Sequence, residues 1–190
     1  MKRRIWVLAL IAICAAIAAR GTVAFFKSEG TATNVVTSGG VDVTVLRQQM
    51  EDGELQADPG GPMPANPGAK VSKIVSVRND LAEAWVRMRC EINFFDAQGI
   101  EVQLTEEELD KLVSMDMDTQ HWSFRDGWWY YQAPLQKKET TTPLFETVKF
   151  SGAIGNDYQN STVELQVFVQ AVQTANNGGS IWEAAGWPES

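Results

Sequence analysis

The single histidine of the chain, His121, is the first residue to consider for catalysis. It follows Asp116 and Asp118 in the string DMDTQHW. A catalytic zinc site takes about three protein ligands and a water, commonly with two histidines on one turn of a helix. One histidine and no HExxH string favour a polar turn over a zinc site, and the aspartate pair lacks the glycine and distal glutamate of a calcium-binding loop. We predict no metal ion and no cofactor.

Nucleophilic catalysis has equally few candidates. The chain has two cysteines, Cys14 in an apolar leader and Cys90 in a strand-like run where apolar residues alternate with polar ones. A serine or cysteine nucleophile needs a general base, and His121 is the only histidine available. We therefore interpret Cys90 as a buried free thiol, and we predict no catalytic residue and no enzymatic activity.

Aromatic residues are the other group with a specific chemistry, because they can bind sugars or partner proteins. Five of them gather around Asp126-Gly127: Trp122, Trp128, Trp129, Tyr130 and Tyr131. Successive strand residues point to opposite faces, so Trp128 and Tyr130 lie on one side and the residue after each of them lies on the other. One set belongs to the core. The other forms an aromatic binding face or is covered by the C-terminal tail, and both alternatives stay open.

The first residues have the composition of an export signal. The string KRR precedes an uninterrupted apolar stretch from Ile5 to Ala19, which is shorter than the about 20 residues of a membrane-spanning helix. Thr22 and Ala24 are small enough for signal peptidase, so we expect cleavage before Phe25. A permanent N-terminal anchor is the alternative. Signal peptidase is thus the first predicted partner, and the protein is expected to be secreted.

The charge of the chain argues against nucleic-acid binding. Four basic residues and no acidic one precede the expected cleavage site, so removing the leader takes the formal charge from -8 to -12. Binding to nucleic acid or to an anionic membrane needs clustered lysine and arginine, which are missing here. We predict no nucleic-acid partner, and contact with a membrane only through the uncleaved leader.

Alternation of apolar and polar residues predicts strands in most of the remaining chain. In AWVRMRCEINFF, every second residue from Ala84 to Phe94 is apolar, while Arg87 and Arg89 lie on the opposite, wet face. The strands expected from such patterns cover 35–46, 70–79, 84–95, 143–152 and 162–173, and a further hairpin turns at Asp126-Gly127. Thr105 and Glu108 form the capping box of one short helix. The proline-rich stretch 57–69 is expected to be a surface loop.

These elements predict an all-β fold: an antiparallel β-sandwich, jelly-roll-like, with one short helix. The length of 190 residues suits one such domain and a targeting segment. The expected organisation is a signal peptide over 1–24, a β-sandwich domain over 25–175 and a tryptophan-containing tail over 176–190.

Three blocks of the sequence also resemble a known family. The strings GTVAFFKSEGTATNVVTSGGVDVTV, NPGAKVSKIVSVRNDLAEAWVRMRCEI and VELQVFVQAVQ resemble, in this order, the leader junction, the second block and the closing strand of the TasA/camelysin family. The resemblance implies a jelly-roll sandwich that is exported through a dedicated signal peptidase. It also implies display in the bacterial cell wall or in the extracellular biofilm matrix.

Some members of this family polymerise into fibres by donating an N-terminal strand to the next subunit. Carried over to this chain, cleavage falls after Ala24, and the donor strand includes Phe25, Phe26, Thr31 and Thr33. The predicted function is therefore a secreted structural protein that associates with itself or with other matrix proteins. Two alternatives remain, a monomeric secreted adhesin that binds through the aromatic hairpin and a camelysin-like metallopeptidase.

Overall fold

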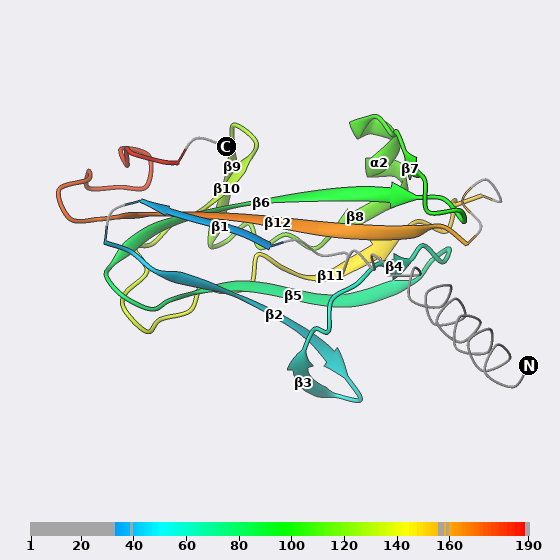
Figure 1. Ribbon diagram of the computed structural model, residues 1–190, viewed down its shortest axis with the longest axis horizontal. Coiled ribbons are helices and arrows are strands. Elements are labelled where there is room, and N and C mark those ends of the chain that lie inside the picture. The colour runs from blue at the N-terminus through cyan, green and yellow to red at the C-terminus, as the bar shows by residue number, and fades with distance from the viewer. Residues whose placement is uncertain (1–32, 39, 156–157, 159, 189–190) are drawn as a thin grey trace, which may run out of the picture.

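Two β-sheets packed face to face make up the structure, a computed structural model that describes residues 33–38, 40–155, 158 and 160–188 (Figure 1). Sheet A has the strand order β1-β12-β6-β10-β9, with β4 against β12 and β7 against β6. Sheet B has the order β3-β2-β5-β11-β8. The predicted all-β sandwich with one short helix is confirmed.

The strands of sheet A are β1 (Thr33–Ser38), β4 (Met63–Pro64), β6 (Ala84–Phe95), β7 (Glu101–Val102), β9 (Trp122–Arg125), β10 (Trp128–Tyr131) and β12 (Thr162–Gln173). Those of sheet B are β2 (Val43–Glu51), β3 (Glu54–Ala57), β5 (Lys70–Asn79), β8 (Val113–Met115) and β11 (Phe145–Phe150). The helix α2 (Glu106–Leu112) lies between β7 and β8 along the chain. All these pairings are antiparallel except that of β1 with β12.

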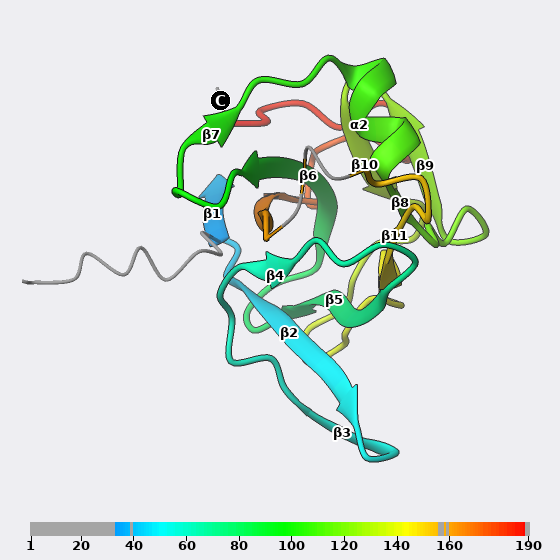
Figure 2. The ribbon, with the colours of Figure 1, turned by 90° about the vertical axis from the view of Figure 1, so that its right-hand side faces the viewer.

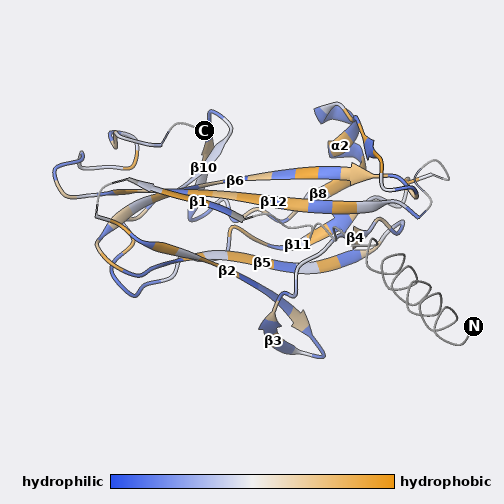
Figure 3. Cartoon of the chain, viewed as in Figure 1, coloured by the Kyte–Doolittle hydropathy of each residue, from blue (hydrophilic) through white to orange (hydrophobic). Residues whose placement is uncertain are grey.

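The long strands carry the alternation that predicted them. β6 and β12 pair along their full lengths, from Ala84↔Gln173 to Phe95↔Thr162. Every second residue of each faces the other sheet, which Figure 3 shows as alternating hydropathy along both strands. Val167 and Val169 are fully buried on that inner face. We call the apolar cluster between the two sheets the inner core.

One expected strand is wrong. The pattern predicts a single strand over 35–46, but the structure divides it into β1 in sheet A and β2 in sheet B. The chain must cross from one sheet to the other here, and a straight strand cannot belong to both. Gly40 lies at a bend in the crossing. Val41 and Val43 still face inward, with 6% and 5% of their surfaces exposed.

The predicted helix start and hairpin turn are confirmed. Thr105 caps α2, because its hydroxyl accepts a hydrogen bond from the Glu108 N–H at 3.3 Å while a Glu108 carboxylate oxygen accepts one from the Thr105 N–H at 2.9 Å. The turn between β9 and β10 has positive φ at both central residues, 49° at Asp126 and 78° at Gly127. Few residue types tolerate this conformation, which is why the Asp-Gly pair predicts the turn.

The proline-rich stretch forms a surface loop apart from the two-residue strand β4. At its start, the buried Asp58 carboxylate accepts a hydrogen bond from Lys73 Nζ at 2.6 Å and lies 3.4 Å from Arg47. Burial alone would raise the pKa of Asp58, but these cations and hydrogen bonds outweigh it and hold the pKa below its usual value. Next to this loop, the β2–β3 hairpin projects from the body of the sandwich (Figure 2).

Candidate functional site

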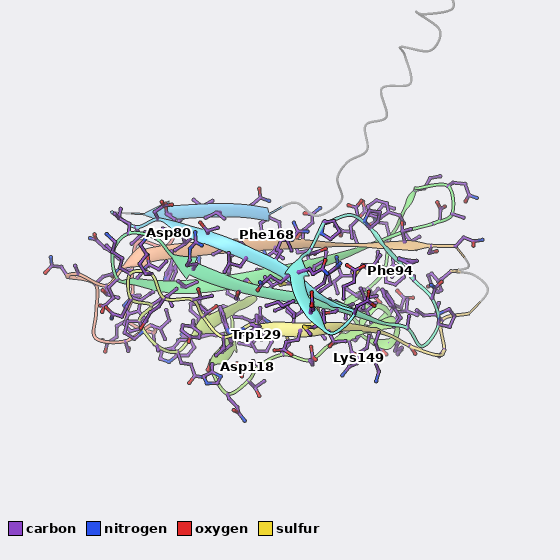
Figure 4. All side chains as sticks on the ribbon, turned by 90° about the horizontal axis from the view of Figure 1, so that it is seen from below. Asp80, Phe94, Asp118, Trp129, Lys149 and Phe168 are labelled. Atoms are coloured by element: carbon purple, nitrogen blue, oxygen red, sulfur yellow. The ribbon has the colours of Figure 1, made fainter. Side chains whose placement is uncertain are left out.

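The N-terminal strand β1 lies at an open edge of sheet A. It pairs with β12 from Thr33↔Val167 to Ser38↔Val172, and no other described strand pairs with its second side. Asn34 is the register partner of Phe168, which lies beside β1 (Figure 4). Val35 and Val36 are 40% and 45% exposed, so β1 packs loosely on the sandwich.

Most of the predicted processing site lies outside the described residues. Among the predicted cleavage and donor residues, Thr33 alone is part of the described chain, at the first position of β1. The others lie before it: Thr22, Ala24, Phe25, Phe26 and Thr31. The structure thus describes the end of the predicted donor segment and leaves the cleavage site a prediction.

The five residues of the predicted aromatic face are divided between two places. Trp122 is 1% exposed and belongs to the inner core, and Trp129 and Tyr131 pack against that core. Trp128 and Tyr130 point to the outer face of sheet A, where a second apolar cluster buries them. The hairpin therefore does not present one exposed face made of all five rings.

The C-terminal tail covers the outer pair. Ile181 of the tail is 3% exposed and packs with Trp85, Trp128, Tyr130 and Val172, a set of residues that we call the outer cluster. Two tail tryptophans extend it: the ring centroid of Tyr130 lies 5.2 Å from that of Trp182 and 5.9 Å from that of Trp187. Of the two alternatives that the sequence left open, coverage by the tail is the arrangement in the structure.

Arg87 joins the tail to the sheet. Its guanidinium carbon lies 4.4 Å from the ring centroid of Trp128 and 4.6 Å from that of Trp187, so the cation is stacked between a sheet residue and a tail residue. Its Nη1 donates to the Tyr130 hydroxyl at 2.9 Å, and its Nη2 donates to Gln170 Oε1 at 2.6 Å. These contacts hold the planar cation in one orientation.

Arg89, two residues after Arg87 on β6, also lies between two aromatic rings. Its guanidinium carbon lies 5.1 Å from the centroid of Trp128 and 4.7 Å from that of Phe168, and it forms an ion pair with Glu91 at 3.1 Å. Sequence reasoning assigned both arginines only to a wet face. Their positions two residues apart, on a strand next to an aromatic strand, are the signal that could have predicted alternating cations and rings.

The tail is attached by hydrogen bonds near its start and by side-chain contacts further along. Thr174 N–H donates to Glu83 O at 3.2 Å, and Asn177 Nδ2 donates to Gln173 O at 3.0 Å. In the described chain after Asn177, the hydrogen bonds of the tail are internal, such as that from the Ala185 N–H to Asn177 Oδ1 at 2.8 Å. Beyond Asn177, apolar and cation–aromatic contacts therefore hold the tail on the sheet.

The aspartates near His121 have structural partners. Asp118 Oδ2 lies 2.7 Å from His121 Nδ1 and accepts from the Thr142 hydroxyl at 2.9 Å, while Asp116 Oδ1 accepts from the Thr147 N–H at 2.7 Å. Burial alone would raise the pKa of Asp118, but the hydrogen bonds from His121 and Thr142 hold it below its usual value. In the described ranges, no three histidine, cysteine or acidic side chains are grouped as a metal site.

Cys90 is a half-buried free thiol on β6, packed against the inner core. Burial raises the pKa of this thiol to about 12. The thiolate is the reactive form of cysteine, so near neutral pH Cys90 is almost wholly in its unreactive form. This geometry gives the residue a packing role.

A groove of about 730 Å³ opens between β6 of sheet A and β8 of sheet B. Its walls are mostly apolar and include Ile92, Leu109, Val113, Met115 and Phe124. Three acidic residues also line it: Glu91, Glu106 and Asp110. This groove could not be predicted from the sequence, because its walls come from strands and a helix far apart along the chain.

Comparison with protein-family models, with curated proteins and with solved structures gives no match for this chain. Within the described residues, no helix is both long and apolar enough to cross a bilayer.

Proposed function

We propose that this chain is a secreted structural protein of the bacterial cell surface or biofilm matrix, and that it associates with further copies or with other matrix proteins through its N-terminal strand. One observation carries the proposal: β1 is a loosely packed strand at an open sheet edge, and its first residue, Thr33, is the last residue of the predicted donor segment. An edge strand offers unpaired N–H and C=O groups to another chain.

The partner strand of β1 supports the exchange of this strand between copies. β12 is buried on its inner face and pairs along its whole length with β6, so it stays in place when β1 leaves. The β12 edge of one subunit can then accept β1 and the preceding residues of the next subunit. Backbone pairing supplies the affinity, and side-chain contacts fix the register.

The composition supports the secreted location. An apolar leader after the string KRR suits export, and a charge of -12 after cleavage suits a soluble protein whose assembly depends on salt. N-terminal sequencing of the secreted form tests this part of the proposal. We expect Phe25 as the first residue and loss of processing in Ala24→Glu, whereas a mature chain that begins at or before Arg20 would refute the site.

Light scattering after size-exclusion chromatography tests the association. The chain that begins at Phe25 is expected to grow in mass with concentration and to form fibres visible by electron microscopy. A chain that lacks residues 25–38 keeps the β12 edge but has no donor, so it is expected to stay monomeric. Equal monomeric masses for both chains at every concentration would overturn the proposal.

A matched pair of substitutions separates the β1 edge from other exposed edges. Proline removes a backbone donor, so Val36→Pro in β1 is expected to stop growth of the oligomers. Leu55 lies on β3, an edge strand of sheet B, and is 53% exposed. Leu55→Pro is expected to leave growth unchanged, and equal loss of growth in both variants would remove β1 from the mechanism.

A further inference from the structure

The pairing of β6 contains a gap on one side. Its first side is paired along the whole strand with β12. On its second side, β10 pairs with Arg87 and Met88, and β7 pairs with Phe94 and Phe95. Between these two short strands, no described strand pairs with Arg89 to Asn93.

The gap has the length of a short strand. At about 3.3 Å per residue, Arg89 to Asn93 offers roughly 16 Å of open edge, within the range of strands in ordinary sheets. Every second residue of a strand directs its N–H and C=O to the same side, so part of this backbone faces the gap without a strand partner. An added strand would complete sheet A between β10 and β7.

The groove described above lies along this gap. Cys90 and Ile92 of β6 line it, and Leu109 of α2 with Val113 and Met115 of β8 form the opposite wall. A volume of about 730 Å³ is in the range of ligand-binding clefts. Side chains on one face of an added strand would enter an apolar space, while its backbone would pair with β6.

Charge indicates the kind of segment that fits. Glu91, Glu106 and Asp110 line the groove, and of these Glu91 is paired with Arg89. No cation pairs with the side chain of Glu106 or Asp110 within the described chain. A lysine or arginine in the bound segment would meet this negative charge, whereas an acidic segment such as the exposed tip of the β2–β3 hairpin would be repelled.

We propose that this groove binds an extended peptide segment of a partner protein, which adds to Arg89–Asn93 of β6 as a further strand and places apolar side chains in the groove and a basic side chain near Glu106 and Asp110. This site is separate from the β1 edge, because β12 and β6 lie between them in sheet A. It gives the chain a second mode of contact that does not depend on strand donation.

Fluorescence anisotropy with a short labelled peptide tests the proposal on the mature chain. A peptide of alternating valine and lysine is expected to bind saturably, and a peptide of alternating valine and glutamate is expected to bind at least about tenfold more weakly. The same valine-lysine peptide with methylated backbone nitrogens cannot form the added ladder, so its binding is expected to be lost. Equal binding of all three peptides, or no saturable binding of the first, would overturn the proposal.

Charge reversal on α2 locates the peptide. The double variant Glu106→Lys with Asp110→Lys is expected to weaken binding of the valine-lysine peptide by roughly tenfold. Glu107→Lys is the matched control, because this exposed residue lies on the same helix but does not line the groove. All three positions are exposed, so the fold should persist. Equal weakening by the control would refute the assigned site.

Nuclear magnetic resonance identifies the occupant. Bound peptide is expected to slow hydrogen exchange at the amides of residues 89–93 and to leave those of β1 unchanged. A peptide that copies residues 25–34 is a second probe. If it slows hydrogen exchange at the same amides, the partner is a second copy of this chain. Protection at β1 alone would overturn the proposal, as would binding of a small apolar dye without any peptide binding.

Discussion

The inner core and the outer cluster bury aromatic and aliphatic side chains in different ways. The inner core lies between two hydrogen-bonded sheets, so both of its walls are held by backbone pairing. The outer cluster has one such wall, sheet A, and is closed on the other side by a tail that side chains hold. Arg87 provides a cation between a ring of the outer cluster and a ring of the tail, and among the described residues no buried side chain of the inner core is a cation. The comparison suggests that the two clusters can be disrupted separately.

Truncation in the inner core is expected to give the largest effect. Phe145 is fully buried between the sheets, so Phe145→Ala should lower the free energy of unfolding by about 3–5 kcal/mol. Urea denaturation measures this change. A loss of less than about 1 kcal/mol would mean that the site can collapse around the missing ring.

Removal of the tail is expected to have the next largest effect. Deleting residues 175–190 uncovers Trp128 and Tyr130 and removes the buried Ile181, at a cost of roughly 2–3 kcal/mol. The sandwich should still unfold cooperatively, with increased binding of an apolar dye. The comparison fails if the deletion leaves dye binding and the urea midpoint unchanged, or if it abolishes the folded state.

A single substitution in the stack is expected to have a smaller effect. Arg87→Lys keeps the charge but loses the planar group between Trp128 and Trp187, so the free energy of unfolding should fall by about 1–2 kcal/mol. The near-ultraviolet circular dichroism of the tryptophans should change with it. Lys111→Arg, on the exposed face of α2, is the control and should change neither signal.

Acidification is expected to have the smallest effect on the free energy of unfolding. The residue that responds, Asp58, lies outside both clusters. The pKa of Asp58 is lower in the folded chain than its ordinary value of 3.8, so its stabilising contribution is present above that value and is lost as the pH falls through the folded-state pKa. Stability in wild type should therefore fall more steeply below about pH 4 than in Asp58→Asn, which starts from a lower stability. Parallel acid curves for the two chains would remove Asp58 from this response.

The long strands and the helix start were predictable because their determinants are local. β5, β6 and β12 begin and end where the alternation of apolar residues predicts, and Thr105 with Glu108 fixes the start of α2. The division of 35–46 was missed because the alternation belongs to the second half alone: Val41 and Val43 face inward, whereas the adjacent Val35 and Val36 of β1 are both exposed.

The candidate sites were less predictable because their parts are distant along the chain. The tail has no period that would indicate its contact with Tyr130, and Arg87 looks like any exposed strand arginine until Trp187 is placed beside it. The groove depends on where β10 ends and β7 begins along β6, which no pattern within β6 records.

The pairing of β6 with β12 also has a consequence for the order of folding. Residues 96–161 separate the two strands, so the central pair of sheet A forms only after a long loop closes. Such high contact order slows folding, because the entropy of closure is lost before the contacts form. For a chain synthesised from its N-terminus, β12 is the last of the described strands to emerge. The central pair of sheet A therefore cannot form until synthesis is nearly complete, whereas every strand of sheet B has emerged before β12.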